Sequence, residues 1–171
     1  MNIKKVALAV LVLCLGFSKM NAQENVVKFN PLAIIFGSFQ VSYERVVSDN
    51  SSLQLDLGFT SFKYTSGFSE VKYTGFGAGA QYRFYLGSSN EPPVGFFAGP
   101  IASFSTASSD DFKVTTIVAG GIIGYQWNFD PITLDLYAGP AYYSVDADDP
   151  TFSFGFDGFG AVLGLSVGVA F

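Results

Sequence analysis

Residues Gly164–Phe171, GLSVGVAF, decide the fold that this sequence predicts. Followed back to Phe159, the odd positions carry mainly Phe, Leu and Val, whereas the even positions carry mainly Gly, Ser and Ala. Alternation with a period of two is typical of a β-strand. A face of small residues adds little volume to a soluble core, but it suits the interior of a narrow closed barrel. We therefore expect the apolar face of this strand to point outward.

The N-terminus predicts a secretory signal peptide, residues 1–22. A short basic segment is followed by an unbroken apolar run over residues 6–17, and cleavage is expected after Ala22. The run is shorter than the roughly 20 residues that a membrane helix needs. Lipoprotein attachment at Cys14 is disfavoured because the residues just before it are not small. This leaves residues 23–171 as a single barrel domain.

The composition of the expected mature chain excludes several classes of protein. Three of the nine basic residues lie in the signal peptide, so six face fourteen acidic ones and the net charge is −8. Such a chain is a poor partner for nucleic acid, whose phosphates require Lys and Arg. It also lacks cysteine, which excludes a disulfide scaffold. Abundant Gly, Tyr and Phe in period-two segments instead favour an all-β barrel.

Eight segments of β-rich sequence are separated by turn clusters. The expected strands are Val26–Phe36, Phe39–Val47, Leu53–Tyr64, Val71–Leu86, Val94–Thr106, Lys113–Phe129, Ile132–Val145 and Phe154–Phe171. In several of these segments large apolar residues share one face and Gly or polar residues share the other. Eight strands leave an interior that modest side chains fill. The sequence therefore predicts an eight-stranded antiparallel up-and-down transmembrane β-barrel, with the large apolar residues outside.

Over the whole expected mature chain, the sequence resembles the small outer-membrane β-barrel proteins of Gram-negative bacteria, of the OmpX and OmpA type. The resemblance lies in the signal peptide, the eight alternating segments and the aromatic C-terminal residue. It implies an outer-membrane location in contact with lipid, with Val169 and Phe171 as the signal for the barrel-assembly machinery. Ser166 stands where the family pattern has Gly, so the match to that signal is partial.

Polar residues on the inward face predict a network inside the lumen, toward the end that carries the termini. Its members are Glu44, Asp56, Gln81, Arg83, Gln126 and Asp135. The favoured interpretation is an ion-pair and amide network that fills the lumen, because an unpaired buried charge is costly. Three carboxylates face one Arg, and either Lys28 or Arg45 is expected to offset the acidic excess. The alternative is a narrow channel with a charged gate.

No enzymatic activity, cofactor or metal site is expected. The chain has no histidine to act as a general base, and its match to Gly-x-Ser-x-Gly, Gly164–Gly168, lies within the expected last strand and not at a strand-to-helix elbow. The acidic clusters Asp110-Asp111 and Asp146–Asp149 are interpreted as solvated loops. We expect a non-enzymatic envelope protein with a structural or interaction role and an envelope protein as a candidate partner. The alternative of another class is a soluble periplasmic barrel that, like a lipocalin, binds an apolar ligand.

Two further expectations concern the strands themselves. Pro100 and Pro140 each follow Ala-Gly inside an expected strand, where proline removes a ladder donor, so we expect a β-bulge at both. Aromatic residues near the strand ends are expected to form two interface girdles. These are Tyr43, Tyr82, Phe84, Tyr125, Trp127 and Phe129 at one end, and Phe62, Phe104, Tyr142 and Phe159 at the other.

Overall fold

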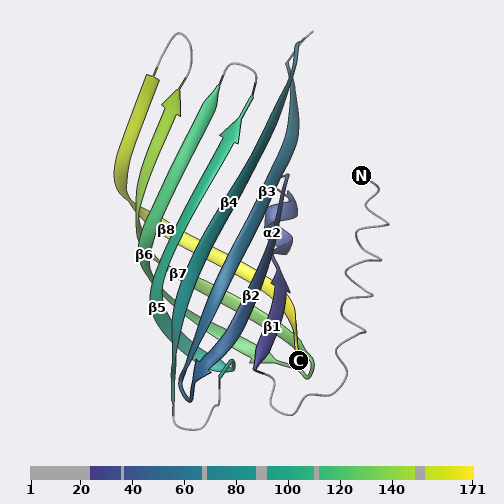
Figure 1. Cartoon of the computed structure of the whole chain (residues 1–171), viewed down its shortest axis with the longest axis vertical. Coiled ribbons are helices and arrows are strands. Elements are labelled where there is room, and N and C mark those ends of the chain that lie inside the picture. The colour runs from purple at the N-terminus through teal and green to yellow at the C-terminus, as the bar shows by residue number, and fades with distance from the viewer. Residues whose placement is uncertain (1–23, 36, 67–68, 88–91, 110–111, 149–152) are drawn as a thin grey trace.

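The computed structural model is a closed barrel of eight antiparallel strands in sequence order, each paired with the next (Figure 1). The structure describes residues 24–35, 37–66, 69–87, 92–109, 112–148 and 153–171. The strands are β1 Asn25–Phe29, β2 Ser38–Ser48, β3 Ser51–Ser66, β4 Ser69–Leu86, β5 Gly95–Ser108, β6 Lys113–Asn128, β7 Ile132–Asp148 and β8 Ser153–Ala170. One short helix, α2, spans Pro31–Ile35. The signal peptide expected at residues 1–22 lies outside the described residues, as do Asp110-Asp111 and part of the loop before β8.

The two terminal strands close the ring. Val26–Phe29 of β1 pair with Val167–Ala170 of β8. The backbone of Phe171 continues this pairing, since its N–H donates to the Asn25 carbonyl at 2.9 Å and its carbonyl accepts from the Asn25 N–H at 3.2 Å. The expected eight-stranded all-β barrel is thereby confirmed.

The first expected strand, Val26–Phe36, is wrong beyond Phe29. The chain leaves the sheet at Asn30 and forms α2, whose first residue is Pro31. The Asn30 side-chain oxygen accepts from the N–H of Leu32 at 2.9 Å and of Ala33 at 3.2 Å. Asparagine is a favoured helix N-cap and proline a favoured first helical residue, so local chemistry here overrides the strand pattern.

The expected β-bulges at Pro100 and Pro140 are also wrong. Pro100 pairs without interruption with Gly121 of β6, and Pro140 pairs with Ala161 of β8. On the opposite side of each proline the ladder opens over two residues and resumes in the same register. Each proline therefore opens one ladder locally, and no extra residue is inserted. A register shift occurs instead between Val46 and Ser48, next to the β2–β3 turn.

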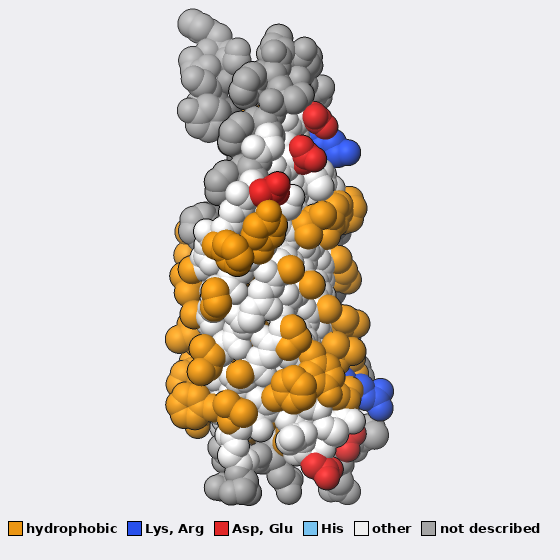
Figure 2. All heavy atoms as spheres, turned by 90° about the vertical axis from the view of Figure 1, so that its left-hand side faces the viewer, with side chains coloured by type: hydrophobic (Ala, Val, Ile, Leu, Met, Phe, Trp, Pro, Cys, Tyr) orange, Lys and Arg blue, Asp and Glu red, His pale blue; other side chains and the backbone are white. Residues whose placement is uncertain are grey.

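The outer wall of the barrel carries exposed apolar side chains. Leu57 is 62 % exposed, Phe159 86 % and Leu163 75 %. On the face shown in Figure 2, hydrophobic side chains cover the middle of the wall, whereas the acidic and basic ones lie toward its two ends. Aromatic pairs reinforce this wall, including Tyr82 with Phe84, Tyr125 with Trp127, Phe96 with Tyr125, and Tyr142 with Phe159. In a soluble barrel the apolar face of each strand points inward, whereas in this barrel it points outward.

The wall is asymmetric where α2 replaces a strand. Among the described residues, backbone pairing joins β8 to β1 only from Val167 onward, so the rest of β8 is paired with β7 alone. Helix α2 contacts both β2 and β8 at this place. Its side chains Leu32, Ile34 and Ile35 are exposed on the surface. Among the described residues, no helix has the length and hydropathy needed to cross a bilayer.

Candidate functional site: a buried charge cluster in the lumen

Charged and amide side chains from six strands meet inside the barrel, at the level where β1 pairs with the last residues of β8. They occupy the inward positions of their strands, where their neighbours in sequence point outward. We call this set the charge cluster, and its members are Lys28 of β1, Glu44 of β2, Gln54 and Asp56 of β3, Gln81 and Arg83 of β4, Gln126 of β6 and Asp135 of β7. The strand alternation thus gathers residues separated by more than 100 positions in the sequence.

Lys28 is the centre of the cluster. Its ammonium nitrogen lies 2.6 Å from Glu44 Oε2 and 2.6 Å from Asp135 Oδ2. It also donates to Gln126 Oε1 at 2.8 Å and to Gln54 Oε1 at 3.0 Å. Lys28 is 1 % exposed and both carboxylates are fully buried. A lysine without water depends on such partners, because an isolated buried ammonium is very costly.

Arg83 is the second buried cation. Its Nη1 forms an ion pair with Asp135 and lies 3.8 Å from Glu44 Oε2. Its Nη2 and Nε donate to Gln81 Oε1 at 2.7 and 3.1 Å. The guanidinium carbon lies 4.3 Å from the centre of the Phe97 ring, which is within the range of a cation–π interaction. Arg83 therefore joins the ionic part of the lumen to its aromatic part.

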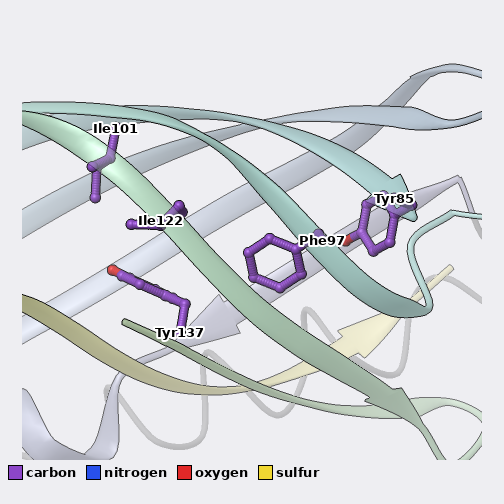
Figure 3. Close-up of a cluster of buried hydrophobic side chains, with 5 residues drawn as sticks. All are labelled: Tyr85, Phe97, Ile101, Ile122 and Tyr137. Carbon is purple, nitrogen blue, oxygen red and sulfur yellow. The ribbon is translucent and has the colours of Figure 1, made fainter. Parts of the chain in front are cut away.

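The aromatic part belongs to a hydrophobic cluster of five buried side chains, Tyr85, Phe97, Ile101, Ile122 and Tyr137 (Figure 3). The rings of Tyr85 and Phe97 have their centres 5.7 Å apart. The Tyr85 hydroxyl donates to Glu44 Oε1 at 2.7 Å, and the Ser52 hydroxyl donates to the same oxygen. Glu44 is thus held by two hydroxyl groups and by Lys28, which leaves it little freedom to move.

Asp56 lies at the edge of the charge cluster and is bound differently from Glu44 and Asp135. Its Oδ1 accepts from Gln54 Nε2 at 2.7 Å, and its Oδ2 accepts from Gln81 Nε2 at 3.1 Å. None of the cations in the described part of the chain forms an ion pair with it. Neutral amide groups alone therefore hold this carboxylate.

All six residues predicted for the lumen network lie inside the barrel, and they contact one another either directly or through Lys28. Of the two basic residues proposed to offset the acidic excess, Lys28 lies in the cluster and Arg45 is exposed on the outside. Gln54 and the five-residue hydrophobic cluster were not among the predicted network residues. Their inward parity was the available signal, since Tyr85 follows Arg83 by two positions and Gln54 precedes Asp56 by two.

The cluster offers no metal site of the usual kind. Among the described residues, no group of three His, Cys, Asp or Glu side chains is placed to hold a metal ion.

Val169, one of the two residues expected in the assembly signal, pairs with Val27 on one side and Ile132 on the other. Phe171 lies at the point where the ring closes.

A comparison with protein families places the chain. A family model described as "Protein of unknown function (DUF3575)" matches residues 8–153. The chain belongs to this family. The matched DUF3575 region contains every member of the charge cluster and ends at the first residue of β8. No curated protein and no solved structure matches the chain significantly.

Proposed function

We propose that the protein is a non-enzymatic integral outer-membrane β-barrel with a structural or interaction role in the cell envelope. The observation that carries the proposal is the inversion of the barrel, with exposed Leu and Phe on the outer wall and a buried ion cluster inside. Pairing around the ring satisfies the backbone groups of the paired strands, which favours crossing lipid with strands. Helix α2 contacts β8, which β1 pairs only from Val167 onward. In this proposal lipid covers the apolar wall, and the termini lie on the periplasmic side.

The charge cluster supports a structural role over conduction. Lys28, Glu44, Arg83 and Asp135 are each at most 1 % exposed and bind one another across the lumen. A conducting path needs water or mobile ions, and paired side chains at this depth obstruct both. We therefore propose that the cluster seals the barrel at this end, and that interactions with lipid or with an envelope protein involve its outer surface.

The resemblance to OmpX and OmpA barrels supports the same proposal. The barrel-assembly machinery is then the partner during biogenesis, with Val169 and Phe171 in its recognition signal. We propose no catalysis, because the chain contains no histidine and no cysteine after residue 22. The alternative of a soluble lipocalin-like barrel is favoured by one observation, the buried hydrophobic cluster around Phe97.

Membrane fractionation tests the proposal directly. We expect the native protein in the outer-membrane fraction, with gel mobility in detergent that differs between unboiled and boiled samples. A closed membrane barrel gives such a shift because it resists detergent until heated. Recovery in the soluble periplasmic fraction would overturn the proposal and favour the lipocalin-like alternative.

A further inference from the structure

The barrel interior is hollow on the side of the charge cluster that faces away from the C-terminus. A cavity of about 370 Å³ lies there. Its wall is formed largely by small inward residues, among them Gly58, Gly77, Gly79, Ser103 and Ser105. The expectation that side chains fill an eight-stranded lumen thus holds for one half of this barrel. The volume of the other half lies within the range of small-ligand sites.

Asp56 lines this cavity and forms no ion pair with Lys28 or Arg83, the two cations of the charge cluster. It is 8 % exposed, which is enough for its carboxylate to be reached from the cavity while remaining shielded from bulk water. The charge cluster contains three carboxylates, of Glu44, Asp56 and Asp135, but two cations, Lys28 and Arg83. Both cations bind the other two carboxylates. A third positive charge at Asp56 would balance the cluster.

The surroundings of Asp56 select the kind of cation. Gln81 Nε2 donates to Asp56 Oδ2 at 3.1 Å and to the Tyr137 hydroxyl at 3.3 Å, so the carboxylate and the hydroxyl are neighbours. The amide N–H groups of Gln54 and Gln81 point toward Asp56, and a metal ion requires oxygen ligands in such places. An ammonium group needs only acceptors for its own N–H groups. Asp56, Tyr137 and Ser103 provide such acceptors on the cavity lining.

Apolar residues lie on the same lining. Ile101, Val162 and the ring of Tyr137 face the cavity together with Asp56. Such a combination of one charge, a few polar groups and apolar surface suits a ligand with a charged end and a hydrocarbon body. Aromatic rings also attract ammonium ions. The lining extends to Ala33 of α2 and to Leu163 of β8, on the two sides of the place where these elements meet without strand pairing.

We propose that the cavity is a binding site for an organic ammonium ion, whose nitrogen binds Asp56 and whose alkyl part lies against Ile101 and Val162. The site goes beyond the proposed envelope role and requires the closed barrel only, not its insertion into a membrane. The ammonium group belongs either to a free amine that enters through the barrel end or to an amine-bearing amphiphile that enters from the bilayer past α2.

Calorimetric titration of the purified protein in non-ionic micelles with n-butylammonium tests the site, with 1-butanol as the uncharged probe. Asp56→Asn keeps the shape of the side chain and removes its charge, and we expect it to weaken butylammonium binding by about tenfold or more. The matched control is Asp157→Asn, which removes the same charge from an exposed position of β8 and should change the affinity by less than about twofold. Equal binding to the wild type and to Asp56→Asn, or equal binding of 1-butanol, would overturn the proposal.

A second pair of variants tests the cavity without changing any charge. A Cβ added at Gly58 meets its nearest atoms, Phe39 O and Gly77 O, at 3.9 and 4.0 Å, so the backbone tolerates a side chain there. Gly58→Leu should fill the cavity and reduce butylammonium affinity by about tenfold or more. Gly121→Leu adds the same side chain on the outer wall, where a Cβ meets open space, and should leave the affinity unchanged. Unimpaired binding to Gly58→Leu would place the ammonium elsewhere and overturn the proposal.

Two further measurements are needed. One distinguishes a free amine from an amine-bearing amphiphile as the ligand, and the other distinguishes failure of the ligand site from failure of the membrane proposal. The first compares dodecylammonium with butylammonium, each after subtraction of the binding measured for Gly58→Leu. Much tighter binding of dodecylammonium indicates an amphiphile from the bilayer, whereas equal affinities indicate a free amine. The heat-dependent gel shift of each variant shows that its barrel is closed. A wild-type protein that shows this shift and binds no butylammonium refutes the ligand site alone, whereas a soluble protein that binds butylammonium refutes the membrane proposal alone.

Discussion

Lys28 bridges two carboxylates, with both distances at 2.6 Å, and no other residue in the described part of the chain bridges them as closely. Its removal eliminates two ion pairs and leaves Glu44 and Asp135 to share Arg83. Breaking a buried pair by deleting one partner typically costs several kcal/mol, because the remaining charge stays buried and uncompensated. The stability of the barrel should therefore depend on this single side chain.

We expect Lys28→Met to lower the free energy of unfolding by about 3–5 kcal/mol. Urea-induced unfolding of the refolded barrel in detergent micelles measures the change. Lys113→Met, which removes an exposed lysine at the start of β6, is the control and should change stability by less than about 0.5 kcal/mol. If the two variants proved equally stable, Lys28 would not be the centre of the charge cluster. Adding Glu44→Gln to Lys28→Met should restore part of the loss, since it removes one of the uncompensated charges.

At the residue scale, alternation along each strand was sufficient to name the inward polar residues. Lys28 and Arg45 were both expected as candidates to offset the acidic excess, and alternation distinguishes them. Arg45 follows the inward Glu44 and must point outward, whereas Lys28 precedes the outward Phe29 and must point inward. What alternation cannot supply is the register between strands, which decides that Lys28 meets Asp135, 107 positions away.

At the scale of elements, the principal error was the length of the first strand. The pair Asn30-Pro31 carries a helix-start signal, an N-cap residue followed by proline. The expected strand ran on to Phe36 because Leu32–Phe36 is apolar and fits a strand equally well by composition. The prolines of β5 and β7 were misjudged for a related reason. A bulge is one response to a missing donor, and a local opening of one ladder is another that sequence alone does not distinguish.

Helix α2 depends on its cap. Asn30→Ala removes the oxygen that accepts from the N–H groups of Leu32 and Ala33, and should destabilise the helix by about 1 kcal/mol. Amide hydrogen exchange should therefore accelerate at these two residues and remain unchanged in β4. Asn30→Asp is the control, since it keeps the capping oxygen and loses only the amide donation to Gln40. Unchanged exchange at Leu32 and Ala33 in Asn30→Ala would show that packing against β2 and β8 holds α2 without the cap.

For the whole molecule, the arrangement of apolar and charged side chains is inverted relative to a soluble barrel. Leu57 lies near the middle of β3 and is 62 % exposed. The polar Thr60, three residues further along the same strand, lies on the inward face. In water such a wall would be a large apolar surface that promotes association. In a bilayer the same wall is the stable one, and the cost of a charge on it depends on the depth at which it lies.

This dependence separates the membrane barrel from the lipocalin-like alternative. Leu57→Arg should lower the free energy of unfolding in lipid vesicles by about 2–4 kcal/mol, because it places a cation on the lipid face near the midplane. Asn50→Arg adds the same side chain in the exposed β2–β3 turn and should change stability by less than about 1 kcal/mol, since such positions lie at or beyond the interface. In a soluble barrel both positions face water, so both substitutions would be nearly neutral. Equal, small effects in vesicles would therefore exclude a lipid-facing wall at β3, whatever fraction the protein is recovered in.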